Sequence, residues 1–473
     1  MQKRKFIDRK EELKKLKECY NEKSSQFVVL YGRRRVGKSF LLRHFCEGEK
    51  HLYFTGRRDE ALDITYERFT KAMSEALENP ILAKIKVSSW DEIFKLLDDQ
   101  LGLKKLIIVL DEFQWMHPKK SQLISILQEK WDNEWKHNSK IFLVLCGSII
   151  SFMEKEILSE KSPLYGRRTF SFELEPMAAP FAKGFFLEKS IIEQCKIIMT
   201  LGGVPSYLEL IRDKQSFAQN INRIALTKDG YLVDEIRYIL REQVKVPANY
   251  QLLLETLSRK SCTRAELAKE MQIKNSGALN LYLKNLTDLQ LVRHRSLITK
   301  KNLESLKSSK YFIWDEYLRF YFTFILPNME RIRQNVDDWL YDAIMAPKWE
   351  NYCGYSFELF CWKNIKTIIS ILGIKKVFQQ SGSFWQKQTK AKAGVQIDLV
   401  IERTDGITHI GECKWSSGKI GMSIIEELKR KKDLYPNPKK HTLKTLLITT
   451  HGVTEQVAKS DGIDDVITLN EMF

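Results

Sequence analysis

The chain has 473 residues, of which 43% are hydrophobic and 29% are charged, a composition that excludes a disordered protein and allows about three folded domains. Its formal net charge of +17 at pH 7 favours a polyanionic partner, with nucleic acid favoured over an anionic membrane surface. The eight cysteines are scattered without zinc-ligand spacing, which indicates small buried residues in a reducing compartment.

No segment has the pattern of a signal peptide or of a membrane span. The first residues run directly into charged positions, and no apolar run approaches the roughly 18 to 20 residues that a span requires. We therefore expect a cytoplasmic protein without a membrane partner.

The amino-terminal third alternates segments of strand and helix character. Asp8 and Glu11 match a capping box, which predicts a helix from about Arg9. An apolar strand over residues 27–31 is followed by a loop and a helix. Further strands are expected over residues 51–56, 106–113, 141–148 and 167–175. This alternation predicts an α/β fold with a mostly parallel sheet that is covered by helices.

A glycine-rich loop with the spacing GxxxxGK(S/T) lies between the first strand and the next helix. Its glycines let backbone N–H groups surround phosphate oxygens, and the helix N-terminus adds positive potential. Lys38 is expected to contact the β- and γ-phosphates of ATP and Ser39 to bind Mg²⁺, whereas a surface glycine turn would bind neither. The predicted nucleotide-binding residues are Gly32, Arg33, Arg34, Arg35, Val36, Gly37, Lys38, Ser39 and Phe40.

A second motif is the apolar strand that ends in Asp111 and Glu112. Asp111 can hold Mg²⁺ through water, and Glu112 can polarise the water that attacks the γ-phosphate. A small-molecule kinase has little use for such a glutamate, because its nucleophile is a substrate. ATP hydrolysis is therefore favoured over a pair of acids that merely begins a loop.

Two further segments supply candidates for the same reaction. Ser148 ends the next strand, where it can sense the γ-phosphate or orient the water. Arg167 and Arg168 precede the following strand, and an arginine there could act in trans on the nucleotide of a neighbouring copy in a homo-oligomer. Such a finger contributes roughly 10³ to 10⁵ in rate; the alternative is an ordinary surface pair.

These motifs resemble the archaeal-type P-loop ATPases, a family related to the AAA+ and STAND groups. FIDRKEEL is similar to their amino-terminal motif, GRRRVGKS to their Walker A motif and LIIVLDEF to their Walker B motif. CGS, SPLYGRR and LGGVPSYL are similar to their sensor and lid segments. The resemblance spans essentially the whole chain and implies a five-stranded ASCE core with a helical lid and a winged helix.

The segment after residue 240 predicts three helices followed by strands. Thr263 and Glu266 match a second capping box, and Asn275 or Ser276 can start the third helix. This is the layout of a winged helix-turn-helix, which could place its third helix in the major groove of DNA or pack on the ATPase core as a switch. The candidate DNA contacts are Asn280, Lys284, Arg293, His294 and Arg295.

The pattern D-x(n)-E-x-K lies on two predicted strands near the carboxyl terminus. Asp398 is on the first strand, Glu412 and Lys414 share one face of the second, and residues 404–406 form the turn. Asp398 and Glu412 can converge on one Mg²⁺ ion, and Lys414 can position water or stabilise charge at phosphorus. Glu358, on a predicted upstream helix, could complete the site.

We interpret this pattern as a PD-(D/E)xK nuclease centre that acts on DNA. Many members of the resembled family end in such a domain, after an aromatic segment similar to residues 311–328. The departure is Ile397, which stands where the motif has proline. The alternatives are a cross-strand ion pair on an exposed face and a degenerate domain that only binds. A helix and a last strand over residues 445–450 complete the predicted domain.

A basic tract lies beside this pattern. It could hold a phosphate backbone, which would make binding salt-dependent, or it could be a solvated helix face. The tract comprises Lys429, Arg430, Lys431 and Lys432, followed by Lys439, Lys440 and Lys444.

The predicted architecture is therefore α/β: an ASCE-type P-loop parallel sheet core with a helical lid, a winged helix-turn-helix, and a carboxyl-terminal α/β domain of the restriction-endonuclease type. The predicted bounds are 1–178 for the core, 179–240 for the lid, 241–310 for the winged helix-turn-helix, and 311–473 for the aromatic helical linker with the last domain. The predicted function is ATP hydrolysis coupled to DNA binding and metal-dependent DNA cleavage. Two alternatives remain: a STAND-type switch whose last domain only binds nucleic acid or a protein, and a DNA-remodelling motor.

Overall fold

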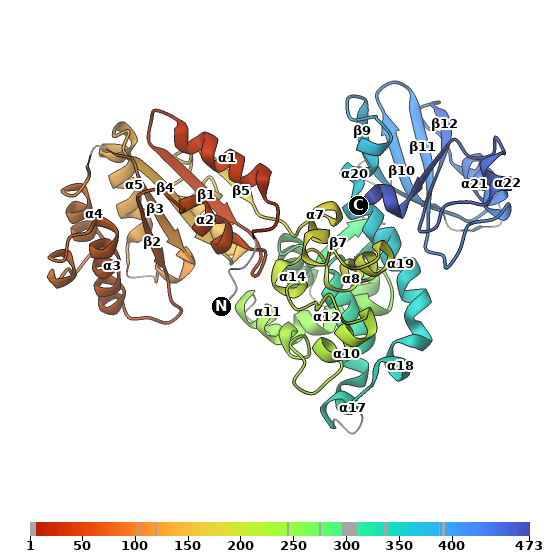
Figure 1. Cartoon of the computed structure of the whole chain (residues 1–473), viewed down its shortest axis with the longest axis horizontal. Coiled ribbons are helices and arrows are strands. Elements are labelled where there is room, and N and C mark those ends of the chain that lie inside the picture. Colours follow the sequence, from red (N-terminus) through yellow and green to blue (C-terminus); the bar gives the residue numbers. More distant parts are fainter. Residues whose placement is uncertain are drawn as a thin grey trace. The chain divides into compact units, whose positions relative to one another are not determined.

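The computed structural model describes residues 6–102, 104–118, 121–243, 246–273, 276–295, 310–334, 338–386, 388–389 and 393–473. The chain forms two compact units, Met1–Pro176 and Met177–Phe473 (Figure 1). This division lies next to the predicted boundary after residue 178, whereas the boundaries after residues 240 and 310 stay predictions. In the described part of the chain, no helix is both long and apolar enough to cross a membrane.

A five-stranded parallel sheet forms the centre of the amino-terminal unit. Its strands lie in the order β2-β3-β4-β1-β5, so that β4 separates β1 from β3, as expected of an ASCE core. The strands are β1 (Gln26–Tyr31), β2 (His51–Thr55), β3 (Leu106–Asp111), β4 (Ile141–Gly147) and β5 (Phe170–Glu173). The predicted strands and the predicted parallel sheet are confirmed.

Helices cover both faces of this sheet, because alternate strand residues point to opposite sides (Figure 1). On β1, Phe27 and Val29 pack in one core cluster and Val28 and Leu30 in the other. The first cluster includes α3 (Leu62–Leu77), α4 (Trp90–Asp98) and α5 (Leu123–Asn133), and the second includes α1 (Lys10–Asn21) and α2 (Lys38–Cys46). A short α6 (Ile150–Phe152) follows β4. Burial on both faces explains why the strands read as near-continuous apolar runs.

The start of α1 differs from the predicted capping box. The helix begins at Lys10, and Arg9 is its N-cap residue with φ 66°, without a side-chain cap. The Arg9 guanidinium donates instead to Glu12 (2.9 Å), to the Val36 carbonyl (3.2 Å) and to the Glu175 carbonyl (2.7 Å). The Asp8–Glu11 prediction is therefore wrong, because Arg9 ties α1 to the glycine-rich loop and to the segment after β5.

The carboxyl-terminal unit begins with a helical region, as predicted. Its helices are α7 (Ala179–Ala182), α8 (Ile191–Leu201), α9 (Pro205–Leu208), α10 (Phe217–Ala225) and α11 (Glu235–Gln243). The buried faces of α8 and α10 carry most of their apolar residues.

Next comes what we call the three-helix segment. It comprises α12 (Pro247–Arg259), α13 (Arg264–Glu270) and α14 (Ser276–Asp288), with a small antiparallel sheet of β6 (Cys262–Thr263), β7 (Val292–Arg295) and β8 (Lys310–Ile313) in the order β6-β8-β7. The predicted capping box of Thr263 and Glu266 is present, and the predicted three helices followed by strands are confirmed. Ser276 is the first residue of α14, and Asn275 lies outside the described residues.

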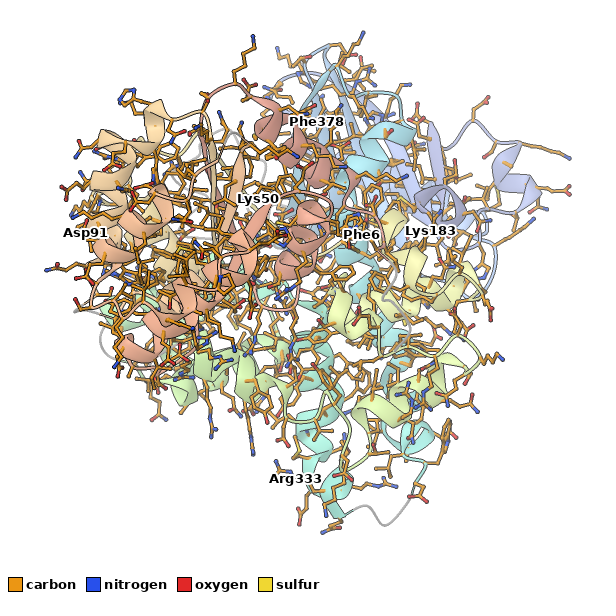
Figure 2. All side chains as sticks on the ribbon, turned by 60° about the vertical axis from the view of Figure 1, so that its left-hand side comes forward. Phe6, Lys50, Asp91, Lys183, Arg333 and Phe378 are labelled. Atoms are coloured by element: carbon orange, nitrogen blue, oxygen red, sulfur yellow. The ribbon has the colours of Figure 1, made fainter. Side chains whose placement is uncertain are left out.

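The rest of the unit is a group of helices followed by a mixed sheet. The helices are α16 (Glu316–Phe320), a π-helical turn η6 (Tyr321–Ile325), α17 (Met329–Gln334), α18 (Tyr341–Ile344), η8 (Ala346–Lys348), α19 (Trp349–Lys363) and α20 (Ile365–Ile371). The charged side chain of Arg333, on α17 of this unit, extends outward (Figure 2). Asp91, on α4 of the amino-terminal unit, does so as well.

The sheet has the order β13-β12-β11-β10-β9, antiparallel from β9 to β11 and parallel from β11 to β13. Its elements are β9 (Phe378–Gln386), β10 (Val395–Arg403), β11 (Ile407–Lys414), α21 (Ser423–Leu434), β12 (Thr442–Thr449), α22 (Glu455–Ala458) and β13 (Asp465–Thr468). The predicted hairpin around residues 404–406 is confirmed. The strand over residues 445–450 is not the last one, because β13 pairs beyond it.

Candidate nucleotide and metal sites

The glycine-rich loop connects β1 to α2 through backbone conformations that favour glycine. Gly32 has φ 146° and Gly37 has φ 95°. A Cβ atom on Gly32 would lie 2.5 Å from the Leu174 carbonyl oxygen, so no larger residue fits there. Arg35 also has a positive φ of 71°. The loop therefore bends tightly enough to turn its N–H groups toward a phosphate at the start of α2.

Lys38 is the first residue of α2 and folds back over this loop. Its ammonium donates to the carbonyls of Gly32 (2.8 Å) and Arg33 (2.9 Å), and the side chain is buried. Burial lowers the pKa of Lys38, although Glu112 and Asp111 act in the opposite direction. Ser39 follows in the same turn, half-buried, and the ring of Phe40 stacks on Phe6. A phosphate arriving here would offer the ammonium stronger acceptors than two backbone carbonyls.

Asp111 is held in one orientation at the end of β3. Its Oδ2 accepts from the Tyr53 hydroxyl on β2 (2.7 Å), and its Oδ1 accepts from the Glu112 N–H (3.0 Å). Burial and the charge of Asp111 raise the pKa of Tyr53, so the hydroxyl remains a donor. Sequence reasoning missed Tyr53, because Tyr53 becomes a neighbour of Asp111 only when β2 pairs with β3.

Glu112 lies beside Ser148, at the edge of the sheet where β3 and β4 end. Glu112 has the left-handed φ of 52°, an uncommon backbone conformation for a non-glycine residue. Its Oε2 accepts from the Ser148 hydroxyl (2.6 Å) and from the Gln114 side-chain amide, which lies 3.2 Å from the Ser148 hydroxyl. The carboxylate is thus fixed by two donors, as a group that aligns a water molecule requires. Gln114 was not predicted, although it stands only two residues after Glu112.

The two arginines after β4 are engaged within their own unit. Arg167 donates to both carboxylate oxygens of Asp132, with the shortest contact 2.6 Å, and also to the Pro163 carbonyl. Arg168 donates to the Leu158 carbonyl (3.1 Å) and lies over the ring of Tyr165. A role of Arg167 in trans would require its release from Asp132 and stays a prediction.

Asp398 and Glu412 occupy facing positions on two strands of the carboxyl-terminal sheet. The register pairs Leu399 with Gly411, so the preceding and following residues, Asp398 and Glu412, lie opposite each other. A bulge between Ile397 and Val400 interrupts the pairing of β10 with β9 at this point. Such bulges re-aim a side chain, and here Asp398 accepts from the Cys413 N–H and from the Gln396 amide, both at 3.2 Å.

Two lysines balance the charge of Glu412. The Lys414 ammonium lies 2.8 Å from Glu412 Oε1, and the Lys431 ammonium, from α21, contacts Oε2. Glu427 on α21 joins them, 3.0 Å from Lys414 and 3.3 Å from Lys431. Burial lowers the pKa of Lys414, but the carboxylates of Glu412 and Glu427 raise it by more, so this pKa lies above its usual value. Lys431 is buried, so the prediction of a phosphate-binding or solvated basic tract is wrong for this residue.

Glu358 on α19 adds a third carboxylate to this neighbourhood. Burial raises the pKa of Asp398, and the charge of Glu358 raises it further. No group of three or more acidic, histidine or cysteine side chains within the described ranges is arranged to enclose a metal ion. The facing pair of Asp398 and Glu412 nevertheless fits Mg²⁺, which keeps several waters and is commonly held by one or two carboxylates.

A pocket of about 470 Å³ borders this acid pair. Lys310 of β8 lies 5.0 Å from the ring centre of Trp385 on β9, and Arg430 donates to the Gly394 carbonyl. Gln396 and Lys431, which contact Asp398 and Glu412, line the same pocket. The pocket lining therefore holds three cations and an aromatic ring, and through Gln396 and Lys431 it adjoins the facing carboxylates.

Three of the predicted DNA contacts of the three-helix segment have protein partners here, and the side chain of Arg295 lies outside the described residues. Asn280 accepts from Arg264 (3.0 Å), Arg293 stacks 4.0 Å from the Trp314 ring centre, and the His294 ring lies 6.0 Å from that of Tyr311. Lys284 lies on α14 near Asp288, whose pKa burial raises. These contacts leave DNA recognition a prediction.

Comparison with known proteins establishes the relationship of the whole chain. An ATPase domain found predominantly in Archaea matches residues 6–211. An uncharacterized protein of Methanocaldococcus jannaschii is 30% identical over 434 residues, which cover 91% of this chain and 92% of that protein. The chain belongs to the archaeal-type P-loop ATPases. The Walker-type ATPase of Pyrococcus abyssi is similar to this P-loop ATPase in fold, with a TM-score of 0.52, 19% identity and coverage of 67% of this chain and 96% of that chain.

Two further matches concern parts of this P-loop ATPase. Residues 321–431 match a family of archaeal and bacterial proteins of unknown function. A second M. jannaschii protein, described as an uncharacterized ATP-binding protein, is 49% identical over 45 residues, which cover 10% of this chain and 76% of that protein. The match over residues 321–431 includes Glu358, Asp398, Glu412 and Lys414 but names no activity.

The buried acid pair of the P-loop ATPase gives its stability a specific pH dependence. Burial and the charge of Asp398 raise the pKa of Glu412 from 4.5 to about 7. The folded state therefore holds this proton more tightly than the unfolded state, and the contribution to stability falls as pH rises from 4.5 to about 7. Glu412→Gln removes this titration. In metal-free protein, we expect the Tm of the variant relative to wild type to rise with pH across this window.

Scanning calorimetry at several pH values measures this difference in Tm. Exposed Glu426→Gln, on α21, is the matched control and should show a difference that does not change with pH. A difference for Glu412→Gln that is the same at every pH would show that the carboxylate has an ordinary pKa.

Proposed function

We propose that this P-loop ATPase uses its nucleotide state to control DNA binding and a metal-dependent DNA cut made by its carboxyl-terminal unit. The observation that carries the proposal is the pairing of Asp398 with Glu412 across β10 and β11, with Lys414 at 2.8 Å from Glu412. Two buried acids on facing strands with an adjacent ammonium are suited to hold a cation and to stabilise a developing negative charge.

At the nucleotide, the contacts of the loop and of the residues at the end of β3 support a role for each side chain. Lys38 would exchange its backbone carbonyl partners for the β- and γ-phosphates of ATP, and Ser39 and Asp111 would hold Mg²⁺. Glu112, fixed by Ser148 and Gln114, aligns the attacking water. The similarity to an ATP-binding protein of M. jannaschii supports ATP as the nucleotide.

At the carboxyl-terminal site, Asp398 and Glu412 would hold Mg²⁺, whose bound water is more acidic and which offsets negative charge on a phosphate. The Cys413 N–H and Gln396 keep Asp398 oriented toward Glu412. Lys414, held between Glu412 and Glu427, can donate to a phosphate oxygen at this position. Lys431 neutralises Glu412 while the metal is absent.

Nucleic acid is favoured as the substrate by the pocket beside these acids. A basic groove with an aromatic ring is the usual combination for a single strand, because phosphates pair with the cations and a base can stack on the ring. Lys310, Trp385 and Arg430 supply these groups. The order of helices and strands in the three-helix segment is that of a winged helix, which could deliver a duplex to the same unit.

A second function is a STAND-type switch that does not cut. The contact of Lys431 with Glu412 favours it, because an ammonium occupies the carboxylate that would otherwise hold the metal. In that case the carboxyl-terminal unit only binds nucleic acid or a protein.

The test uses purified full-length protein with end-labelled single-stranded DNA and with plasmid. Each is incubated with ATP or ADP and with Mg²⁺, Mn²⁺ or a chelator. The proposed function predicts cuts that require the metal and whose rate differs between ATP and ADP. ATP turnover without a cut under any metal would refute the nuclease and leave the switch.

A further inference from the structure

A second pocket in the carboxyl-terminal unit, of about 420 Å³, combines several cations with no carboxylate in its described lining. The walls come from α12, β8, α16, η6, η8 and α19. The charged residues among them are Arg259, Arg319 and Lys348, and the polar residues Asn351 and Tyr355 lie beside them. This volume is within the usual range for a small-molecule site.

Arg319 is the unusual residue of this pocket. Its side chain is 4% exposed, and its Nη2 donates to the Met199 carbonyl (3.2 Å). Within the described ranges, its buried Nε and Nη1 atoms have no hydrogen-bond partner. Leaving buried donors of a charged group unsatisfied is costly, so such atoms call for an acceptor that the described residues do not supply.

The acids nearest to Arg319 in the sequence are used elsewhere. Glu316 pairs with Lys363 (2.6 Å), and Asp315 accepts from the Leu318 N–H as the cap of α16. The guanidinium instead lies 5.5 Å and 5.9 Å from the ring centres of Tyr352 and Tyr355, a stacking that fixes its plane.

The other two cations differ in their availability. Lys348 is exposed at the end of η8, immediately before α19. Arg259 pairs with Glu255 (2.6 Å) on the same helix, and Glu255 is not part of the pocket lining. A fixed, buried guanidinium with an exposed ammonium at the rim is an arrangement suited to an anion with several acceptor oxygens.

We propose that this pocket binds a small phosphate monoester, with its phosphate on Arg319 and Lys348 and its organic part against Tyr352, Tyr355 and the apolar residues Leu257 and Ile313. A phosphate supplies several acceptor oxygens for the unpartnered guanidinium nitrogens, and the volume accommodates an attached organic group. The ligand would bridge α12 of the three-helix segment to α19, the helix that carries Glu358. This proposed site does not depend on the proposed nuclease activity.

The experiment is isothermal titration calorimetry with inorganic phosphate and with AMP as the probes. The full chain carries Lys38→Ala, so that binding at the glycine-rich loop is suppressed. We expect saturable binding of both, with AMP tighter. Arg319→Gln should weaken both by roughly tenfold or more, as expected for loss of a charged hydrogen bond.

Lys348→Gln is the second variant, because this exposed residue can be changed without unfolding the chain, and it should also weaken binding of both probes. The matched control is Lys366→Gln, because Lys366 is an exposed lysine on α20 outside the pocket. This control should leave the affinity for phosphate and for AMP unchanged. The proposal is overturned if neither probe binds, or if Arg319→Gln and Lys348→Gln bind both probes as tightly as the Lys366→Gln protein does.

Discussion

A Glu112→Gln variant should still bind ATP but turn it over at least about 100-fold more slowly than wild type, because a positioned general base contributes roughly 10² to 10⁴ in rate. Glutamine has nearly the same shape and can still accept from the Ser148 hydroxyl, which lies 2.6 Å from the carboxylate. What it cannot do is polarise a water molecule as an anion does. The nucleotide affinity therefore stays close to that of wild type while kcat falls.

Steady-state phosphate release measures kcat, and binding of a fluorescent ATP analogue measures affinity. The matched control is Glu129→Gln, an exposed glutamate on α5 of the same unit, which should leave both unchanged. Turnover by Glu112→Gln at the wild-type rate would remove Glu112 from the reaction and would leave its left-handed backbone without a functional explanation.

An Asp398→Asn variant should lose metal-dependent DNA cleavage by more than about 100-fold, since loss of even an outer-shell partner of a metal ligand costs roughly 10- to 100-fold. Asparagine keeps the size of the side chain and can still accept from the Cys413 N–H, so the strand pairing survives. It removes the negative charge that faces Glu412. ATP turnover should not change, because the nucleotide residues belong to the other compact unit.

The matched control for this variant is Asp405→Asn. Asp405 is in the turn of the same hairpin, where it accepts from the Arg403 Nε at 2.9 Å, and it does not contact Glu412. Cleavage is read from end-labelled DNA at a fixed Mg²⁺ concentration. If Asp398→Asn cuts at the rate of Asp405→Asn, the cut does not come from this centre.

The parts of the nucleotide site that are contiguous in the sequence could be predicted. The contacts that form only when the chain folds could not. The loop from Gly32 to Ser39 is local, so its spacing alone indicates the phosphate contacts. Tyr53 and Gln114 belong to no motif, because they meet Asp111 and Glu112 only through strand pairing and a short turn. The capping box of Asp8 and Glu11 is wrong because that pattern assumes an extended N-cap, whereas Asp8 has a φ of 52° and the N-cap residue is Arg9.

At the carboxyl-terminal centre, the alternation of side chains predicts that Glu412 and Lys414 share a face, and the short turn predicts the hairpin that brings Asp398 opposite them. The bulge at Asp398 has no sequence signal. The burial of Lys431 does have a sequence signal. Ile424, Leu428 and Lys431 are three or four residues apart, the spacing of one helix face, and all three are buried on α21. A lysine in an apolar stripe is a candidate for a buried ion pair rather than for a surface contact.

The most direct measurement of the central claim is a crystal structure of the protein soaked in Mn²⁺, with anomalous scattering recorded at the manganese edge. The account predicts an anomalous peak between the carboxylates of Asp398 and Glu412, with Lys431 moved away from Glu412. Retention of the Lys431–Glu412 contact at saturating Mn²⁺, with no peak between the two carboxylates, would contradict it.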